Sequence, residues 1–346
     1  MDDTYGLTVT AELNDDPIDS MRKAAEYFEQ NPVMYAHPIS KKTKEIARIG
    51  LRATYFLPAN DREIRLRMLQ AMELVREAFG EKLRWIVLEG GKVKEYKPTP
   101  LAVESLLDRY KGDFGVYVGS SDLENAEGLQ DFQANFFCRQ YFGPNVPVMD
   151  AFEFHVPLSW SIDKASQGGF TSLAGKAAEI LRPHWGTAGY ALTIIMGHMN
   201  PEPSTSLYSV LQKYPGLDCG EAIGDASQYP DGMGSVNWLT WVSDKLLQRI
   251  GGREAARKNL REQPGSEPVK VAELDWGLLF QAGMLPGLGD NGEPGTLPAY
   301  QAVARTLKPL RSPNARGFTA SPAALDADDE DEIWDRETRA WVARFD

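Results

Sequence analysis

Hydrophobic residues recur along the chain with two different periods, and segments of the two kinds follow one another. Residues 7–13 alternate between apolar and polar positions, and residues 49–57 do the same, which predicts half-buried strands. Residues 61–79 instead carry apolar side chains at steps of three and four, which predicts a helix. Asp61 suits the N-terminal cap of this helix, and Gly80 suits its end.

The same two patterns predict further elements along the rest of the chain. Helices are expected at residues 19–30, 99–110, 169–181 and 204–213. Strands are expected at residues 85–88, 93–96, 115–118, 132–141, 152–158, 190–196 and 269–274. Because Pro157 cannot donate a hydrogen bond to a neighbouring strand, the strand that contains it is expected at an edge. Together these elements predict an α+β domain over residues 1–311, with a mostly antiparallel sheet and packed helices.

Two segments resemble each other in a way that suggests a duplicated unit. Residues 107–112 and 211–216 both end a predicted helix with Tyr-x-Gly and lead into a region rich in predicted strands. The domain could therefore consist of two similar halves. Tyrosine and glycine also end helices for ordinary capping reasons, so both interpretations stay open.

The end of the chain has a different pattern. Residues 312–332 lack apolar periodicity and are rich in acidic residues, which predicts a flexible acidic linker. Residues 333–346 place Ile333, Trp334 and Trp341 on one broad side with arginines interleaved, which predicts an amphipathic C-terminal helix. The acidic residues before this helix also favour the positive end of its dipole, so they need no partner to explain them.

Length and composition describe an ordinary soluble protein. A chain of 346 residues fits one large domain or two closely packed ones. No apolar run approaches the roughly 18 to 20 residues that span a bilayer, so no membrane contact is expected. The acidic start at Met1-Asp2-Asp3 lacks the features of a signal peptide. Cys138 and Cys219 lie far apart without metal-ligand spacing, which favours a reducing compartment, the cytoplasm.

The net charge of −12 is unevenly distributed along the chain. Residues 40–97 hold 14 Lys and Arg against 8 Asp and Glu, whereas the rest of the chain holds 23 bases against 41 acids. Residues 214–244 contain no base at all. Because such a surface repels phosphate groups, we expect a basic protein partner and no nucleic acid. For any single acidic run, solubility alone is the simpler explanation.

Motifs for catalysis or cofactor binding are weak. Gly232-Met233-Gly234-Ser235 lacks the second half of a serine hydrolase turn, and residues 283–292 lack the Lys-Ser/Thr pair of a phosphate loop. The four histidines have no zinc-ligand spacing, and those in or beside apolar strands, His155 and His198, are expected to be hydrogen-bonded core residues. Carboxylates such as Asp218 and Asp275 could serve as an acid–base pair, but turn, capping and surface roles are more common. We therefore expect no enzyme, no metal and no cofactor.

Three short segments, taken in order, resemble a family signature. They are Tyr214-Pro215-Gly216-Leu217-Asp218, then Met233-Gly234-Ser235-Val236-Asn237-Trp238-Leu239-Thr240-Trp241 closed by Arg249-Ile250-Gly251-Gly252, and then Leu297-Pro298-Ala299-Tyr300 through Leu307-Lys308-Pro309-Leu310-Arg311. This order resembles the bacterial type VI secretion immunity proteins that protect against nuclease effectors of the VRR-Nuc type, over residues 2–311. Because buried aromatic residues are common, we interpret Trp238 and Trp241 as core residues and not as a binding site.

The resemblance implies a protein that binds and neutralises a cognate type VI secretion toxin, a nuclease, by covering or occupying its active site. The alternatives are an immunity protein for a non-nuclease effector, an uncharacterised carboxylate-based enzyme, and a structural component of the secretion apparatus. Neutralising the acidic residues that meet the toxin should weaken protection and leave the melting temperature unchanged. The candidate residues for this partner-binding role are Asp218, Glu221, Asp225, Asp231, Asp326, Asp328, Asp329 and Glu330.

Overall fold

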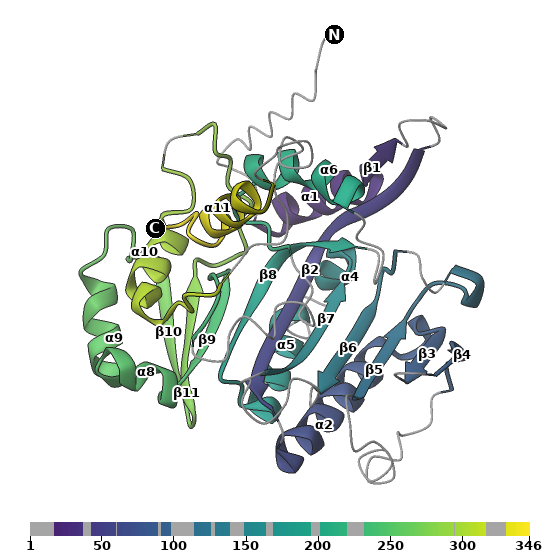
Figure 1. The fold of residues 1–346 in the computed structure, drawn as a ribbon, viewed down its shortest axis with the longest axis horizontal. Helices are drawn as coiled ribbons and strands as arrows, with labels where there is room; N and C mark the ends of the chain where they lie inside the picture. Colours follow the sequence, from purple (N-terminus) through teal and green to yellow (C-terminus); the bar gives the residue numbers. More distant parts are fainter. Residues whose placement is uncertain are drawn as a thin grey trace.

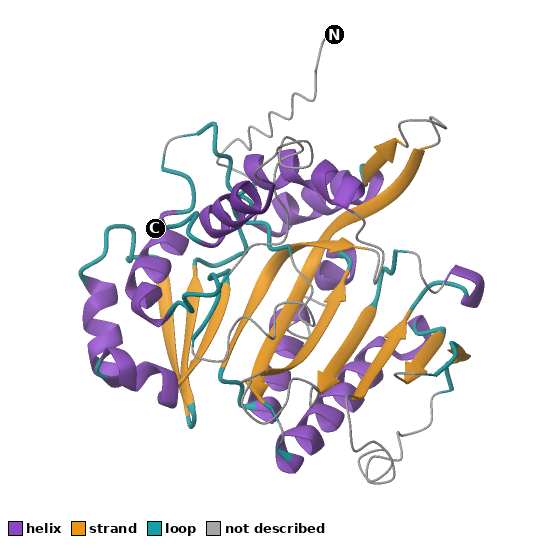
Figure 2. Cartoon of the chain, in the orientation of Figure 1, coloured by secondary structure: helices purple, strands orange, loops and turns teal. Residues whose placement is uncertain are grey.

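One large sheet organises the molecule (Figures 1 and 2). The computed structural model describes residues 17–36, 43–59, 61–88, 91–97, 114–125, 129–138, 149–163, 169–194, 201–219, 232–293, 295–315 and 330–346. Within these ranges eleven strands form a single sheet, and every described strand pair is antiparallel. The predicted α+β fold with a mostly antiparallel sheet is confirmed.

The strands follow the order β10-β11-β9-β8-β2-β7-β6-β5-β3-β4 across the sheet, and β1 pairs with β2 outside this path. Their bounds are β1 Val33–Ala36, β2 Thr43–Pro58, β3 Trp85–Leu88, β4 Lys94–Glu95, β5 Phe114–Gly119, β6 Gln133–Cys138, β7 Met149–Val156, β8 Trp185–Ile194, β9 Leu239–Ser243, β10 Val269–Leu274 and β11 Gly277–Ala282.

Helices cover both faces of this sheet at different places. The described α-helices are α1 Pro17–Gln30, α2 Arg62–Phe79, α4 Leu158–Asp163, α5 Gly169–Leu181, α6 Pro201–Lys213, α8 Asp244–Leu247, α9 Gly252–Arg261, α10 Pro298–Leu307 and α11 Glu330–Val342. Short 3₁₀ turns occupy η1 Gly80–Lys82, η2 Leu123–Asn125, η4 Gln248–Ile250 and η5 Lys308–Leu310. Figure 1 shows α2 and α5 behind the centre of the sheet and α8, α9 and α10 beside β9, β10 and β11.

The long central strand β2 shows why the two faces differ. Residues 49–57 are predicted as a half-buried strand, but all of them are buried, so both faces of this part of β2 are covered. Tyr55 turns toward α5, where its hydroxyl donates a hydrogen bond to the carbonyl oxygen of Ala174 at 2.7 Å. Tyr55 also packs against Trp241 from β9, with 5.4 Å between the ring centroids. The opposite face of β2 carries Arg48 and Arg52, whose side chains form ion pairs with Asp131 and Asp218.

Strongly periodic segments are predicted well. Helix α5 has the predicted bounds and buries Phe170, Leu173 and Leu181 toward the sheet. Helix α2 starts after Asp61, whose carboxylate accepts hydrogen bonds from the first turn, and it ends at Gly80. Each large apolar side chain buried in this way contributes roughly 1.5–3 kcal/mol.

The prediction that the strand before Pro157 lies at an edge is wrong. Strand β7 ends at Val156 and pairs with β2 on one side and with β6 on the other. Proline follows the last paired residue, so its missing N–H costs the sheet no hydrogen bond. Strand β8 also starts at Trp185, earlier than predicted, because the small residues Gly186, Ala188 and Gly189 hide its alternation.

The C-terminal region differs from its predicted division. Helix α11 begins at Glu330, so the last acidic residues before Ile333 belong to its first turn and not to a linker. Ser312 is buried, and its N–H donates to the carbonyl oxygen of Met233 at 2.8 Å, so residues 312–315 also pack on the domain. The apolar side is confirmed at the end of α11, where Trp341 and Val342 are buried, and Phe345 just after the helix is buried too. Ile333 and Trp334 are partly buried. The predicted strand at 7–13, the predicted helix at 99–110 and the linker residues 316–329 lie outside the described residues.

Both cysteines, Cys138 and Cys219, are buried thiols. Among the described helices, none is both long enough and apolar enough to cross a membrane.

Candidate functional site

Of the eight candidate acidic residues, the structure describes the side chain of one, Asp218. Its main chain joins β8, since its N–H donates to Tyr190 and its carbonyl oxygen accepts from Leu192, both at 2.8 Å. Its carboxylate lies 3.2 Å from Nη2 of Arg52. Only the main chain of Glu330 is described, at the start of α11, and the other six lie outside the described residues: Glu221, Asp225, Asp231, Asp326, Asp328 and Asp329.

Asp218 belongs to a polar group on the face of the sheet opposite α5. The side chain of Arg52 is only 8% exposed. Burial alone lowers the pKa of Arg52, but the negative charges of Asp218 and Glu153 outweigh burial and hold the pKa above its ordinary value. Glu153 accepts a hydrogen bond from Asn135 Nδ2 at 3.0 Å. The contact between Asp218 and Arg52 thus gives this carboxylate a role within the fold.

The segments that carry the family resemblance bind the C-terminal end of the chain through Arg344. Arg344, just after α11, donates from Nε to the carbonyl oxygen of Pro215 at 2.6 Å and from Nη1 to Ser235 Oγ at 3.0 Å. Burial lowers the pKa of Arg344 to about 10. A Cβ on Gly216 would stand 1.9 Å from the carbonyl oxygen of Gly287, so this position has room only for glycine. These motif residues therefore hold the C-terminal segment in place.

Trp238 and Trp241, the aromatic residues of the second segment, are 4% and 1% exposed. Their interpretation as core residues is confirmed. The sequence gives one indication that Arg344 is buried. It stands three residues after Trp341 and directly before Phe345, on the apolar side of the predicted helix.

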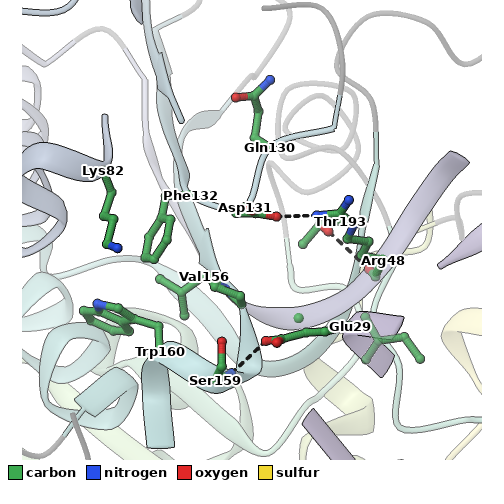
Figure 3. Close-up of a pocket in the computed structure, with 13 residues that line it drawn as sticks. Glu29, Arg48, Lys82, Gln130, Asp131, Phe132, Val156, Ser159, Trp160 and Thr193 are labelled. Carbon is green, nitrogen blue, oxygen red and sulfur yellow. Dashed lines mark hydrogen bonds and ion pairs between the residues drawn. The ribbon is translucent and has the colours of Figure 1, made fainter. Parts of the chain in front are cut away.

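A pocket of about 300 Å³ opens beside the central strands (Figure 3). It lies where β2, β7 and β8 meet the start of α4, with α1 and the turn η1 contributing to its walls. The residues that line it are Glu29, Arg48, Ile49, Gly50, Lys82, Gln130, Asp131, Phe132, Val156, Pro157, Ser159, Trp160 and Thr193. Sequence analysis missed this pocket because no two of its charged residues share a local motif.

Charged side chains of both signs surround the pocket. Arg48 binds the carboxylate of Glu45 and, at 2.5 Å, that of Asp131. These contacts, the one with Glu45 foremost, raise the pKa of Arg48. Glu29 reaches the pocket from α1 and accepts a hydrogen bond from the N–H of Ser159 at 3.0 Å. Figure 3 shows Glu29 and the pair of Arg48 and Asp131 on one side and Lys82 on the other.

Aromatic rings form the opposite wall. Phe132 and Trp160 meet edge to face, with ring centroids 6.1 Å apart. Phe79, at the end of α2, packs against both rings at 5.3 Å and 6.2 Å. This wall is thus fixed by the core behind it.

A buried glutamine, Gln130, belongs to the pocket lining. Gln130 is 4% exposed, and its Oε1 accepts hydrogen bonds from the N–H of Ser121 at 2.8 Å and from Trp85 Nε1 at 3.2 Å. His155 Nε2 donates to the carbonyl oxygen of Gln130 at 2.8 Å. Burial lowers the pKa of His155 to about 4, so its ring is neutral at pH 7. The prediction of a hydrogen-bonded core histidine is confirmed for His155, whereas His198 lies outside the described residues.

One pair of side chains among the described residues resembles part of a catalytic arrangement. Ser243 Oγ lies 3.3 Å from His184 Nδ1, the kind of contact that a serine nucleophile makes. Ser243 Oγ also accepts from the N–H of Leu246 and caps α8, which explains its position without catalysis. In this part of the chain no three His, Cys, Asp or Glu side chains are grouped so that they could hold a metal ion.

Comparison with known proteins gives two informative matches. A family model described as type VI immunity for VRR-NUC matches residues 67–345. This match runs through α11 to Phe345, beyond the part that the sequence motifs cover. Among solved structures, the T6SS protein PA0821 of Pseudomonas aeruginosa is similar with a TM-score of 0.72 and 20% identity, over 96% of this chain and 92% of that chain. At this identity the likeness establishes a shared fold.

Two further comparisons give no information about the fold or the function of this chain. The toxic C-terminal tip of CdiA from Pseudomonas aeruginosa in complex with its immune protein matches at a TM-score of 0.20 and 15% identity, over 44% of this chain and 90% of that chain. A comparison with curated protein sequences gave no match.

Proposed function

Because the chain belongs to the family of type VI immunity proteins for VRR-NUC, we propose that it binds a cognate type VI toxin with nuclease activity and keeps it inactive by covering or occupying its active site. The observation that carries this proposal is the family match, which extends over residues 67–345. The protein acts by binding and catalyses no reaction.

The charge of the chain supports a basic partner. A nuclease must attract the phosphate backbone of DNA, so its active-site groove is expected to be basic. The immunity protein carries a net charge of −12 and would be drawn to the same groove. Opposed potentials speed encounter, while a few well-packed side chains determine affinity. Since DNA lies in the cytoplasm, the inhibitor is expected to meet its toxin there.

Co-expression with the product of the adjacent upstream reading frame tests this function. The neighbour alone should kill the host and degrade its DNA, and the pair should co-purify with both effects suppressed. Co-purification together with killing that leaves DNA intact would instead identify a non-nuclease toxin. A neighbour that neither binds this chain nor harms the host would contradict the proposed function.

A further inference from the structure

The side of the pocket that holds Glu29, Arg48 and Asp131 (Figure 3) carries more negative than positive charge. Glu29 and Asp131 line it, and Glu45 stands behind its wall on Arg48. The two cations are Arg48 and Lys82, and Arg48 already binds both Glu45 and Asp131. On this side of the pocket the three carboxylates Glu29, Asp131 and Glu45 stand against the single cation Arg48, a net charge of −2, and this local charge favours a cation.

The aromatic rings of the opposite wall, on the side of Lys82, offer a second kind of contact to a cation. The ring of Trp160 is partly exposed on the pocket, and its edge-to-face contact with Phe132 fixes its orientation. A cation within about 6 Å of an aromatic face is attracted by the ring quadrupole, and the planar guanidinium of arginine both stacks on a ring and pairs with carboxylates. Acids on one side and aromatic rings on the other match the two faces of an arginine side chain.

Residues 120–125 add a small contact surface beside the pocket, since Ser120 and Ser121 are hydrogen-bonded to lining residues. In the turn η2, Leu123 is 45% exposed, and its neighbours Asp122 and Glu124 are exposed as well. The hydrogen bond from the N–H of Ser121 to Gln130 ties this turn to the pocket wall. Because the loop is held in place before a partner arrives, binding costs less conformational entropy. An apolar residue between two acids fits a basic partner surface with an apolar patch beside its cation.

We propose that this pocket, with residues 120–125 beside it, receives a basic side chain, arginine in particular, from the surface of a partner protein. The inference rests on the proposed function, because the partner protein is taken to be the toxin. Its arginine side chain inserts between Glu29 and Trp160. This contact would let the immunity protein anchor one cationic residue of the toxin while its acidic surface covers the rest.

The pocket itself can be tested without the toxin. The full chain is titrated with acetyl-arginine amide, with neutral acetyl-citrulline amide of the same shape, and with acetyl-glutamate amide. The indole N–H signal of Trp160, identified with Trp160→Phe, and the amide of Ser159 are followed by NMR. The arginine compound should give saturable shifts that citrulline does not give. Equal shifts with citrulline, or shifts with glutamate alone, would overturn the proposal.

Glu29→Gln sharpens this titration. Glutamine keeps an oxygen that can accept from the N–H of Ser159 but removes the charge, so arginine should bind about fivefold more weakly, as for loss of a partly exposed ion pair. Glu26→Gln is the matched control, because Glu26 is exposed on the same helix and does not line the pocket. An equal effect of the two changes would mean that the pocket is not where arginine binds.

The toxin pair then separates the two hypotheses. A variant with Glu29→Gln, Asp122→Asn and Glu124→Gln should bind the co-purifying toxin at least tenfold more weakly than the wild type, while Glu26→Gln binds as the wild type does. If the wild type binds and the triple variant binds equally well, the proposed function stands and this surface is not the interface. If the wild type binds no neighbouring product, the proposed function fails, and the arginine titration alone decides the pocket.

Discussion

Two arginines on the same strand show how one kind of side chain serves the fold in one region and a surface in another. Arg48 and Arg52 lie four residues apart on the same face of β2. The side chain of Arg52 is 8% exposed and pairs with Asp218, whereas that of Arg48 is 35% exposed and pairs with two partly exposed carboxylates. The buried arginine cannot exchange its partner for water, but the exposed one can. Arg52 is therefore expected to contribute mainly to stability, whereas Arg48 lies at the pocket that is proposed to meet a partner.

The largest expected effect comes from removing the buried arginine. Arg52→Met leaves Asp218 and Glu153 without the cation between them, and removing one partner of a buried ion pair costs about 3–5 kcal/mol. Arg48→Met, the matched control on the same strand, should cost about 1 kcal/mol or less because its pairs are solvent-screened. Urea unfolding of both variants measures the difference. Equal losses would abolish the distinction between the two regions.

Lowering the pH should destabilise the folded protein through His155, which lies on the same face of the sheet as Arg52. His155 stands opposite Arg52 in the pairing of β2 with β7, and burial, foremost among the causes, lowers its pKa to about 4 from an ordinary 6.5. Between these values the unfolded chain binds the proton and the folded chain does not, so stability falls as pH drops from 6.5 toward 4. The full contribution is about 3 kcal/mol. The free energy of unfolding is measured for the wild type and for His155→Gln between pH 4 and 6.5. It should depend less steeply on pH in the variant. Parallel curves would contradict a neutral buried histidine.

Asp218 distinguishes a structural acid from a binding acid. Charge alone predicts that neutralising it leaves the melting temperature unchanged, but its contact with buried Arg52 predicts that Asp218→Asn costs about 2 kcal/mol. Asp122→Asn, at an exposed position near the pocket, is the control and should cost about 0.5 kcal/mol or less. Thermal unfolding of the two variants decides. An unchanged melting temperature for Asp218→Asn would return this residue to the set of candidate toxin contacts.

Sequence reasoning succeeds where a local pattern decides the structure. The three- and four-residue steps of residues 169–181 define α5, and Asp61 and Gly80 mark the ends of α2, because caps and periodicity act within a few residues. It fails where the outcome depends on partners far along the chain. Pro157 looks like an edge marker until the register of β7 shows that pairing ends one residue before it.

The site shows the same limit more strongly. The pocket brings Glu29 of α1, Arg48 of β2 and Asp131 near β6 to one place, and only the strand order decides that these segments meet. Arg344 reads as one of several interleaved arginines until its hydrogen bonds to Pro215 and Ser235 are seen. Charge counts identify acidic stretches, but they do not tell a carboxylate that pairs inside the fold from one that faces a partner.

Raising the salt concentration should slow association of the protein with its toxin much more than it changes dissociation. If the acidic surface draws in a basic toxin, raising ionic strength from about 0.05 to 0.5 M shortens the range of the attraction and should slow association about tenfold. Dissociation should change much less, because it depends on the few packed contacts at the interface. Stopped-flow binding at several salt concentrations measures both rates. An association rate that does not respond to salt would remove the electrostatic part of the proposed function.

The smallest expected effect tests the surface beside the pocket. Leu123→Ala shortens an apolar side chain that is 45% exposed, so the free energy of unfolding should stay within about 0.5 kcal/mol. Toxin affinity should fall by about 1 kcal/mol, roughly fivefold, as for a contact beside an anchor residue. Met284→Ala is the control, since Met284 is even more exposed, at 69%, but lies beyond β11 and away from the pocket. Calorimetric titration of the toxin with both variants should find the loss only at Leu123. A loss only at Met284 would place the interface at the β9 to β11 end of the sheet, on the far side from Arg48.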